Sequence, residues 1–113
     1  MSKFFLFSLF MVIFALSSAD AALHKGQKEF LKQCSKCHAG GQTFISKKFT
    51  REWEQIMKNN GEELAKIHLS SKDEKAKPSL EYFKSGELEK NAVHLMQFLM
   101  EYAKDSGKVP ACN

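Results

Sequence analysis

The sequence predicts an all-α fold of three to five helices, on three grounds. No segment after residue 21 alternates apolar and polar residues as a half-buried strand does. Glycines such as Gly61 and Gly86 fall where apolar periods stop, which is where helices tend to end. Apolar residues recur at helical spacing, most regularly near the end of the chain: Leu88, Ala92, Leu95, Met96, Leu99 and Tyr102.

The first 21 residues have the layout of a secretory signal peptide. Lys3 supplies a positive charge, an apolar run follows over residues 4–16, and small residues around Ala21 form an Ala-x-Ala cleavage pattern. The apolar run is shorter than the roughly 20 residues that a membrane-spanning helix needs. We therefore expect a signal peptide over 1–21, one mature domain over 22–113, a periplasmic location and no stable membrane insertion. The alternative is an uncleaved membrane anchor.

The charge pattern makes nucleic acid an unexpected partner. The net charge is +4, carried by scattered lysines. No basic block with interleaved aromatic residues occurs, as a nucleic-acid surface would show. A net positive charge suits docking onto acidic protein surfaces, although an ordinary soluble surface would look the same.

The first helix is expected to run from about residue 25 into the segment 34–38. Glycines at 40 and 41 should end it, and a loop is expected over 42–49. Four residues, spaced by four, four and three positions, share one face of this helix: Gly26, Phe30, Cys34 and Cys37.

A second helix is expected to begin at Thr50, a good N-cap, with Glu52 and Glu54 in a first turn where the helix dipole favours acids. Gly61 should end it. Its apolar face consists of Trp53, Ile56 and Met57.

Shorter elements are expected to follow. A helical piece over 62–68 groups His68 with Leu64 and Ile67. A polar, turn-like stretch over 70–78 comes next. Ser79 then caps one turn that ends at Gly86, and a last helix covers about 87–105.

Residues 34–38 read Cys-Ser-Lys-Cys-His, the Cys-x-x-Cys-His pattern of covalent haem attachment. Thiols one helical turn apart can each add to a vinyl group of the porphyrin, and the adjacent imidazole can bind the iron. Such attachment happens outside the cytoplasm, in agreement with the export signal. We expect one covalent haem c, held by Cys34 and Cys37, with His38 as proximal iron ligand.

Two other interpretations of the cysteine pair fit the sequence less well. A redox dithiol normally accompanies a βαβ pattern, and no strand is expected here. A closed zinc site needs two further ligands at suitable spacing. The remaining candidates are distant and unpatterned: His24, His68, His94 and Cys112.

The order Gly26-x3-Phe30-x3-Cys34-x2-Cys37-His38 resembles the amino-terminal helix of class I cytochromes c. Leu95, Phe98 and Leu99 resemble the carboxy-terminal helix of that family. The resemblance implies an all-α, class I cytochrome c-like fold around the haem. It also implies that Phe30 and Phe98 are core residues where the two helices cross, and that Gly26 permits a close approach of the backbones.

The sixth iron ligand departs from the family pattern. Class I members usually supply a methionine from a loop before the last helix, but no methionine lies between residues 61 and 94. His68 occupies that part of the sequence. Met57, in a Trp-x3-Met arrangement with Trp53, is the first alternative, and another ligand or an open position is the second. A histidine would give a lower reduction potential than a methionine.

The leading functional hypothesis is an electron carrier rather than an enzyme, because haem supplies the redox chemistry. The alternative is a five-coordinate haem protein that binds a small gas as a sensor or scavenger. Lysines near the motif are candidates for a positive rim around the haem edge: Lys32, Lys36, Lys47 and Lys48.

A narrower resemblance concerns the redox partners. Residues 24–38, 51–53 and 102–113 are similar to small monohaem cytochromes that accompany a periplasmic molybdenum sulfite dehydrogenase. This implies electrons taken from that enzyme and passed to a terminal oxidase or another cytochrome. Cys112, the third cysteine, would be an unpaired thiol that forms intermolecular disulfides or an inert residue of the tail.

Overall fold

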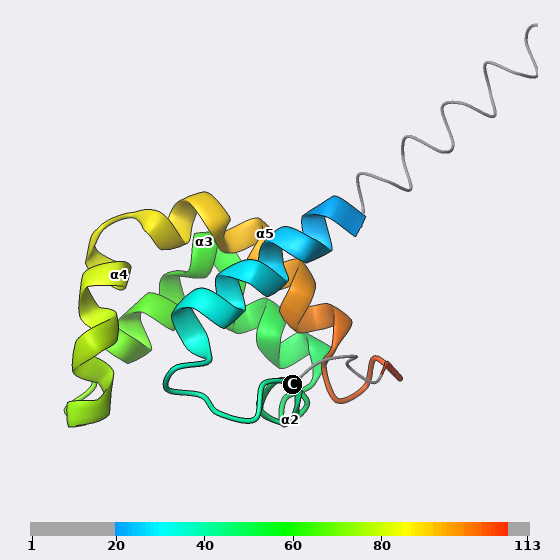
Figure 1. Cartoon of the computed structure of the whole chain (residues 1–113), viewed down its shortest axis with the longest axis horizontal. Helices are drawn as coiled ribbons and strands as arrows, with labels where there is room; N and C mark the ends of the chain where they lie inside the picture. Colours follow the sequence, from blue (N-terminus) through cyan, green and yellow to red (C-terminus); the bar gives the residue numbers. More distant parts are fainter. Residues whose placement is uncertain (1–19, 109–113) are drawn as a thin grey trace, which may run out of the picture.

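The computed structural model describes residues 20–108, and no strand occurs among them (Figure 1). The predicted all-α class is confirmed. Residues 20–29 are helical and continue into a π-helical turn, η1 (Phe30–Cys34). The remaining elements are α2 (Gln42–Ile45), α3 (Thr50–Leu69), the 3₁₀ helix η2 (Glu74–Ser79), α4 (Leu80–Lys84) and α5 (Glu87–Glu101).

Some predictions fall outside these residues. Most of the expected signal peptide, including Lys3 and the apolar run, lies outside them, as does Cys112. Within 20–108, no helix combines the length and apolar character needed to cross a membrane.

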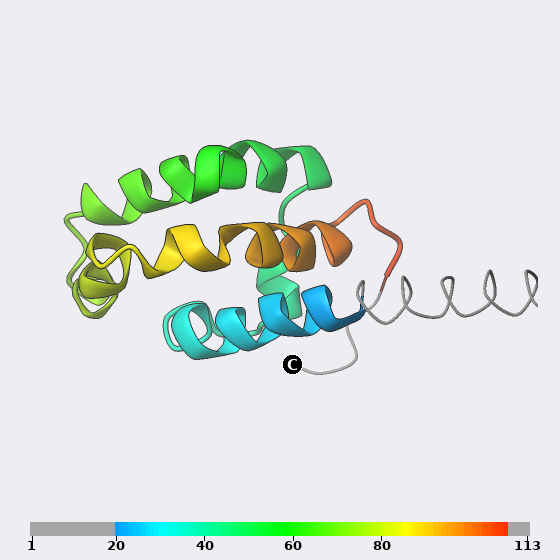
Figure 2. The same ribbon diagram turned by 90° about the horizontal axis from the view of Figure 1, so that it is seen from above.

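The long helices lie in three layers, with α5 between the amino-terminal helix and α3 (Figure 2). Gly26 lies where the amino-terminal helix crosses α5. A Cβ at that position would overlap the carbonyl oxygen of His94 and lie 2.7 Å from Cβ of Phe98. Phe30 and Phe98 pack beside this crossing, with ring centroids 5.7 Å apart. Their predicted core role is confirmed, and only glycine leaves room for this approach.

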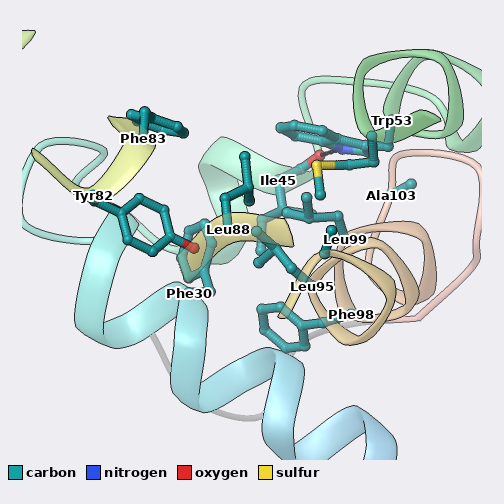
Figure 3. Close-up of a cluster of buried hydrophobic side chains, with 12 residues drawn as sticks. Phe30, Ile45, Trp53, Tyr82, Phe83, Leu88, Leu95, Phe98, Leu99 and Ala103 are labelled. Carbon is teal, nitrogen blue, oxygen red and sulfur yellow. Dashed lines mark hydrogen bonds between the residues drawn. The ribbon is translucent and has the colours of Figure 1, made fainter. Parts of the chain in front are cut away.

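One cluster of buried side chains joins the helices (Figure 3). The Trp53 indole N–H within it donates to the Ile45 carbonyl at 2.9 Å, so its buried polar atom is satisfied. The buried apolar residues are Phe30, Ile45, Trp53, Met57, Tyr82, Phe83, Leu88, Ala92, Leu95, Phe98, Leu99 and Ala103.

Helix α3 is interrupted where the sequence predicts a helix end. Residues 58–61 have non-helical backbone angles, and φ is positive at Asn59 (53°), Asn60 (57°) and Gly61 (79°). Asparagine and glycine are the residues that adopt this left-handed region most readily. The second half of α3, which carries His68, therefore begins after a kink.

The predicted N-cap role of Thr50 is wrong. Phe49 precedes the helix, and its N–H donates to the Glu52 carboxylate at 2.7 Å. Thr50 is the first helical residue, and its N–H and hydroxyl both donate to Oδ1 of Asp105. The predicted loop over 42–49 also contains α2, and the last helix ends at Glu101, so that Asp105 lies beyond it.

Candidate cofactor site

The four residues singled out by the haem motif and the sixth-ligand hypothesis line one cavity: Cys34, Cys37, His38 and His68. Its volume is about 460 Å³, within the range of roughly 300–1,000 Å³ that is usual for cofactor pockets. Its other walls are mainly apolar and include Phe30, Phe44, Trp53, Ile56, Leu64, Ile67, Phe83, Leu95 and Leu99.

The cysteines are placed by a tight turn at the end of the amino-terminal helix. The Ser35 N–H donates to the Phe30 carbonyl, which makes the last turn π-helical, and the His38 N–H donates to the Cys34 carbonyl at 2.9 Å. Single π-helical turns often occur at functional sites. Sequence reasoning missed this widened turn, because no residue pattern marks it.

Both cysteines are free thiols, and their surroundings differ. Cys37 is exposed, and its Sγ lies 3.7 Å from the Lys75 carbonyl oxygen. Burial raises the pKa of the Cys34 thiol to about 12, and the negative charges of Glu29 and Cys37 add to the shift. Cys34 is therefore the more enclosed of the two thiols.

His38 is set against an aromatic ring. Its imidazole stacks on Phe44, with centroids 4.2 Å apart and planes at 19°. Burial, and secondarily the neighbouring His68, lower the pKa of His38. A lowered pKa keeps the imidazole neutral, and the neutral form is the one that binds metals.

His68 has one ring nitrogen engaged and the other available. Nδ1 lies 2.8 Å from the Leu64 carbonyl oxygen one turn earlier in α3. A carbonyl only accepts, so Nδ1 carries a proton, and in the neutral ring Nε2 then has the lone pair. Metal-binding histidines commonly have their second nitrogen held in this way. The ring also stacks on Phe83, with centroids 4.3 Å apart and planes at 24°.

The two imidazoles approach each other within the cavity. Their centroids are 6.1 Å apart, and their planes are at 88°. Metal–imidazole bonds are about 2 Å long, so two imidazoles on opposite sides of one metal ion have centroids about 6 Å apart. The spacing of His38 and His68 would therefore allow both imidazoles to bind one metal ion.

The other sixth-ligand candidates lie elsewhere in the described chain. Met57 is buried and lines a separate cavity of about 610 Å³ between the first half of α3 and α5, as do Met96 and Met100. His24 is exposed, and His94 is half-buried at the helix crossing. His68 alone among these described candidates lines the cavity of His38.

The donor set fits haem c in number and kind. Within residues 20–108, no cluster of three or more His, Cys, Asp and Glu side chains is arranged to hold a metal ion. A haem iron takes four nitrogens from the porphyrin and needs at most two from the protein. Two thiols for the vinyl groups and two imidazoles for the iron meet that requirement.

Two lysines line the cavity, and three others lie near the cysteine motif in the sequence. Lys32, Lys36 and Lys47 are exposed, as their proposed place on the rim requires. Lys48 lines the cavity, with its Nζ 6.0 Å from the Trp53 ring centroid. Lys75 also lines it, and sequence reasoning missed this residue because η2 meets the haem motif only in three dimensions.

Comparison with known proteins adds no family assignment, since no family model, no curated protein and no solved structure matches this chain.

Proposed function

We propose that this chain is an electron-transfer protein that carries one electron on a single covalent haem c. Cys34 and Cys37 would hold the porphyrin by thioether bonds, and His38 and His68 would be the axial ligands. The observation that carries the proposal is the pair of imidazoles, 6.1 Å apart, in an apolar cavity lined by both cysteines. When bound, haem supplies a one-electron couple at iron.

The residues of the chain would set the properties of that couple. Leu64 and Phe83 belong to the apolar walls of the cavity that both imidazoles line. The hydrogen bond from Nδ1 of His68 to the Leu64 carbonyl makes the free nitrogen a better ligand. With haem bound, a second imidazole would close the site to small gases and would favour a lower potential than a thioether. These features support electron transfer over the gas-binding alternative.

The crossing at Gly26 supports a class I-like arrangement of the first and last helices. The proposed distal ligand differs from the usual class I methionine, because it comes from the second half of α3, after the break at residues 58–61. The net charge of +4 and the exposed lysines support docking onto an acidic partner. The narrower proposal is a periplasmic carrier between a molybdenum sulfite dehydrogenase and a terminal oxidase or another cytochrome.

Optical spectroscopy of the haem-loaded protein tests the ligand set. The natural protein should be low-spin in both oxidation states and should not bind carbon monoxide. His68→Ala should become high-spin and bind carbon monoxide. Met57→Leu is the matched control and should behave like the natural protein.

Two outcomes would overturn this ligand set. Carbon monoxide binding by the natural protein would support the gas-binding alternative. A methionine-to-ferric-iron absorption band that disappears in Met57→Leu, but stays in His68→Ala, would assign the sixth position to Met57.

A further inference from the structure

We propose that Phe44 and Phe83 are positioning residues that hold the imidazole planes of His38 and His68 at right angles. This inference rests on the proposed function, because it concerns the orientation of the two proposed axial ligands. It goes beyond that function by assigning a role to two residues outside the haem motif.

Each histidine has its own aromatic partner, and the two pairs have nearly the same geometry. Phe44 lies against His38 with centroids 4.2 Å apart and planes at 19°. Phe83 lies against His68 with centroids 4.3 Å apart and planes at 24°. Because each pair is close to parallel, the plane of each imidazole follows the plane of its phenylalanine. The 88° between the imidazoles is therefore set by how the two phenylalanines are oriented.

The phenylalanines come from elements other than those that carry the histidines. His38 follows η1, whereas Phe44 is in α2; His68 is in α3, whereas Phe83 is in α4. The angle between the imidazoles thus depends on how four segments pack together. Local helix geometry alone does not determine it.

Both phenylalanines are themselves held in place. Phe44 meets Trp53 edge to face, with centroids 5.9 Å apart, and Trp53 is fixed by its hydrogen bond to the Ile45 carbonyl. Phe83 is 8% exposed and meets Tyr82 edge to face at 5.1 Å. A ring packed on its face and its edge cannot turn without displacing its neighbours. Such outer contacts orient metal ligands and fix their planes.

The angle between axial imidazoles has a spectroscopic signature. Perpendicular planes leave the two iron d orbitals of π symmetry close in energy, and the ferric low-spin EPR spectrum is dominated by one line at unusually low field. Parallel planes separate those orbitals and give three well-resolved lines. EPR therefore reports ring orientation independently of electron-transfer activity.

The test compares ferric EPR spectra of haem-loaded variants. The natural protein should show the single low-field line. Phe44→Leu and Phe83→Leu remove the flat ring, keep an apolar side chain, and should shift or broaden this line as the imidazole gains freedom to turn. Phe44→Tyr keeps the ring and should preserve the natural spectrum. The matched control is Phe98→Leu, which replaces a buried aromatic residue at the helix crossing. This variant should also preserve the natural spectrum.

The outcomes separate this inference from the proposed function. A covalent, low-spin haem with three well-resolved lines in the natural protein would overturn the perpendicular arrangement and leave electron transfer in place. Unchanged spectra in both leucine variants would show that the phenylalanines do not orient the ligands. If the natural protein holds no haem, the proposed function itself fails.

Discussion

Asp105 caps the first turn of α3 from the far end of the chain: its Oδ1 accepts the N–H and the hydroxyl of Thr50, each at 2.7 Å. These bonds lower the pKa of Asp105, with the hydroxyl contributing most and the N–H next. The same helical segment carries Trp53, which packs on Phe44 beside the proposed haem site. The contact therefore links the carboxy-terminal part of the described chain to the site.

The first prediction concerns this link and pH. A carboxyl with a lowered folded-state pKa stabilises the fold above its unfolded pKa of about 3.9, and this stabilisation is lost as pH falls through the folded-state pKa. Asp105→Ala should lower the Tm at neutral pH, and the difference from the natural protein should shrink in acid. Thermal unfolding followed by circular dichroism measures it. Glu63→Ala, at an exposed position of α3, is the control. A deficit that does not change with pH would contradict the assignment.

The second prediction concerns the helix crossing. Gly26→Ala places a methyl group against the His94 carbonyl and Phe98. Overpacking of this kind costs about 1–3 kcal/mol, and the contact with rigid backbone favours the upper part of that range. Urea unfolding should show the loss in the free energy of unfolding. Lys28→Ala, at an exposed position of the same helix, should change it little. Equal stability of the two variants would mean that the helices do not cross at Gly26.

The sequence predicted these helices to the extent that local signals marked them. Helical spacing placed Gly26 and Phe30 on one face, the resemblance to class I cytochromes c implied that this face meets the last helix, and Gly61 indicated the break in α3. It did not predict the role of Thr50, because the partner of that residue is 55 positions away and no local pattern announces it. The expected last helix, which ran to residue 105, was too long for a similar reason: α5 ends at Glu101, and Asp105 bonds to the distant Thr50.

The candidate site was likewise predicted from the sequence only in part. The motif at residues 34–38 placed both thiols and His38 together, since they lie within five consecutive residues. His68 was predicted as a ligand because it lies between residue 61 and the last helix, and the structure brings it to the same cavity. The aromatic partners Phe44 and Phe83 were missed in that role, because stacking depends on how separate elements pack. Met57 was a candidate because of its Trp-x3-Met spacing from Trp53, but it lines a different cavity from His38.

The third prediction concerns the reduction potential. His68→Met replaces the proposed distal imidazole by a thioether, which favours ferrous iron. The midpoint potential of the haem should therefore rise relative to the natural protein. A potentiometric titration followed by absorbance measures it. Met57→Leu should leave the potential close to the natural value, whereas a large shift in that variant alone would identify Met57 as the ligand.

The fourth prediction concerns cysteine reactivity. In the natural protein, denatured and reduced, iodoacetamide should modify one cysteine, Cys112, because thioether bonds block Cys34 and Cys37. Peptide mapping identifies the modified residue. The haem-free polypeptide, made without haem maturation, is the control and should be modified at all three cysteines. Three modifications in the protein from a haem-maturing host would rule out attachment through this motif.

The most direct test of the central claim is the intact mass of the denatured protein, purified from the periplasm of a bacterial host that performs c-type haem maturation. We predict the mass of residues 22–113 plus one haem, which stays bound after acid–acetone extraction. Cys34→Ala combined with Cys37→Ala should give the polypeptide mass alone. A natural protein that also shows only the polypeptide mass would contradict covalent haem attachment, and with it the proposed electron carrier.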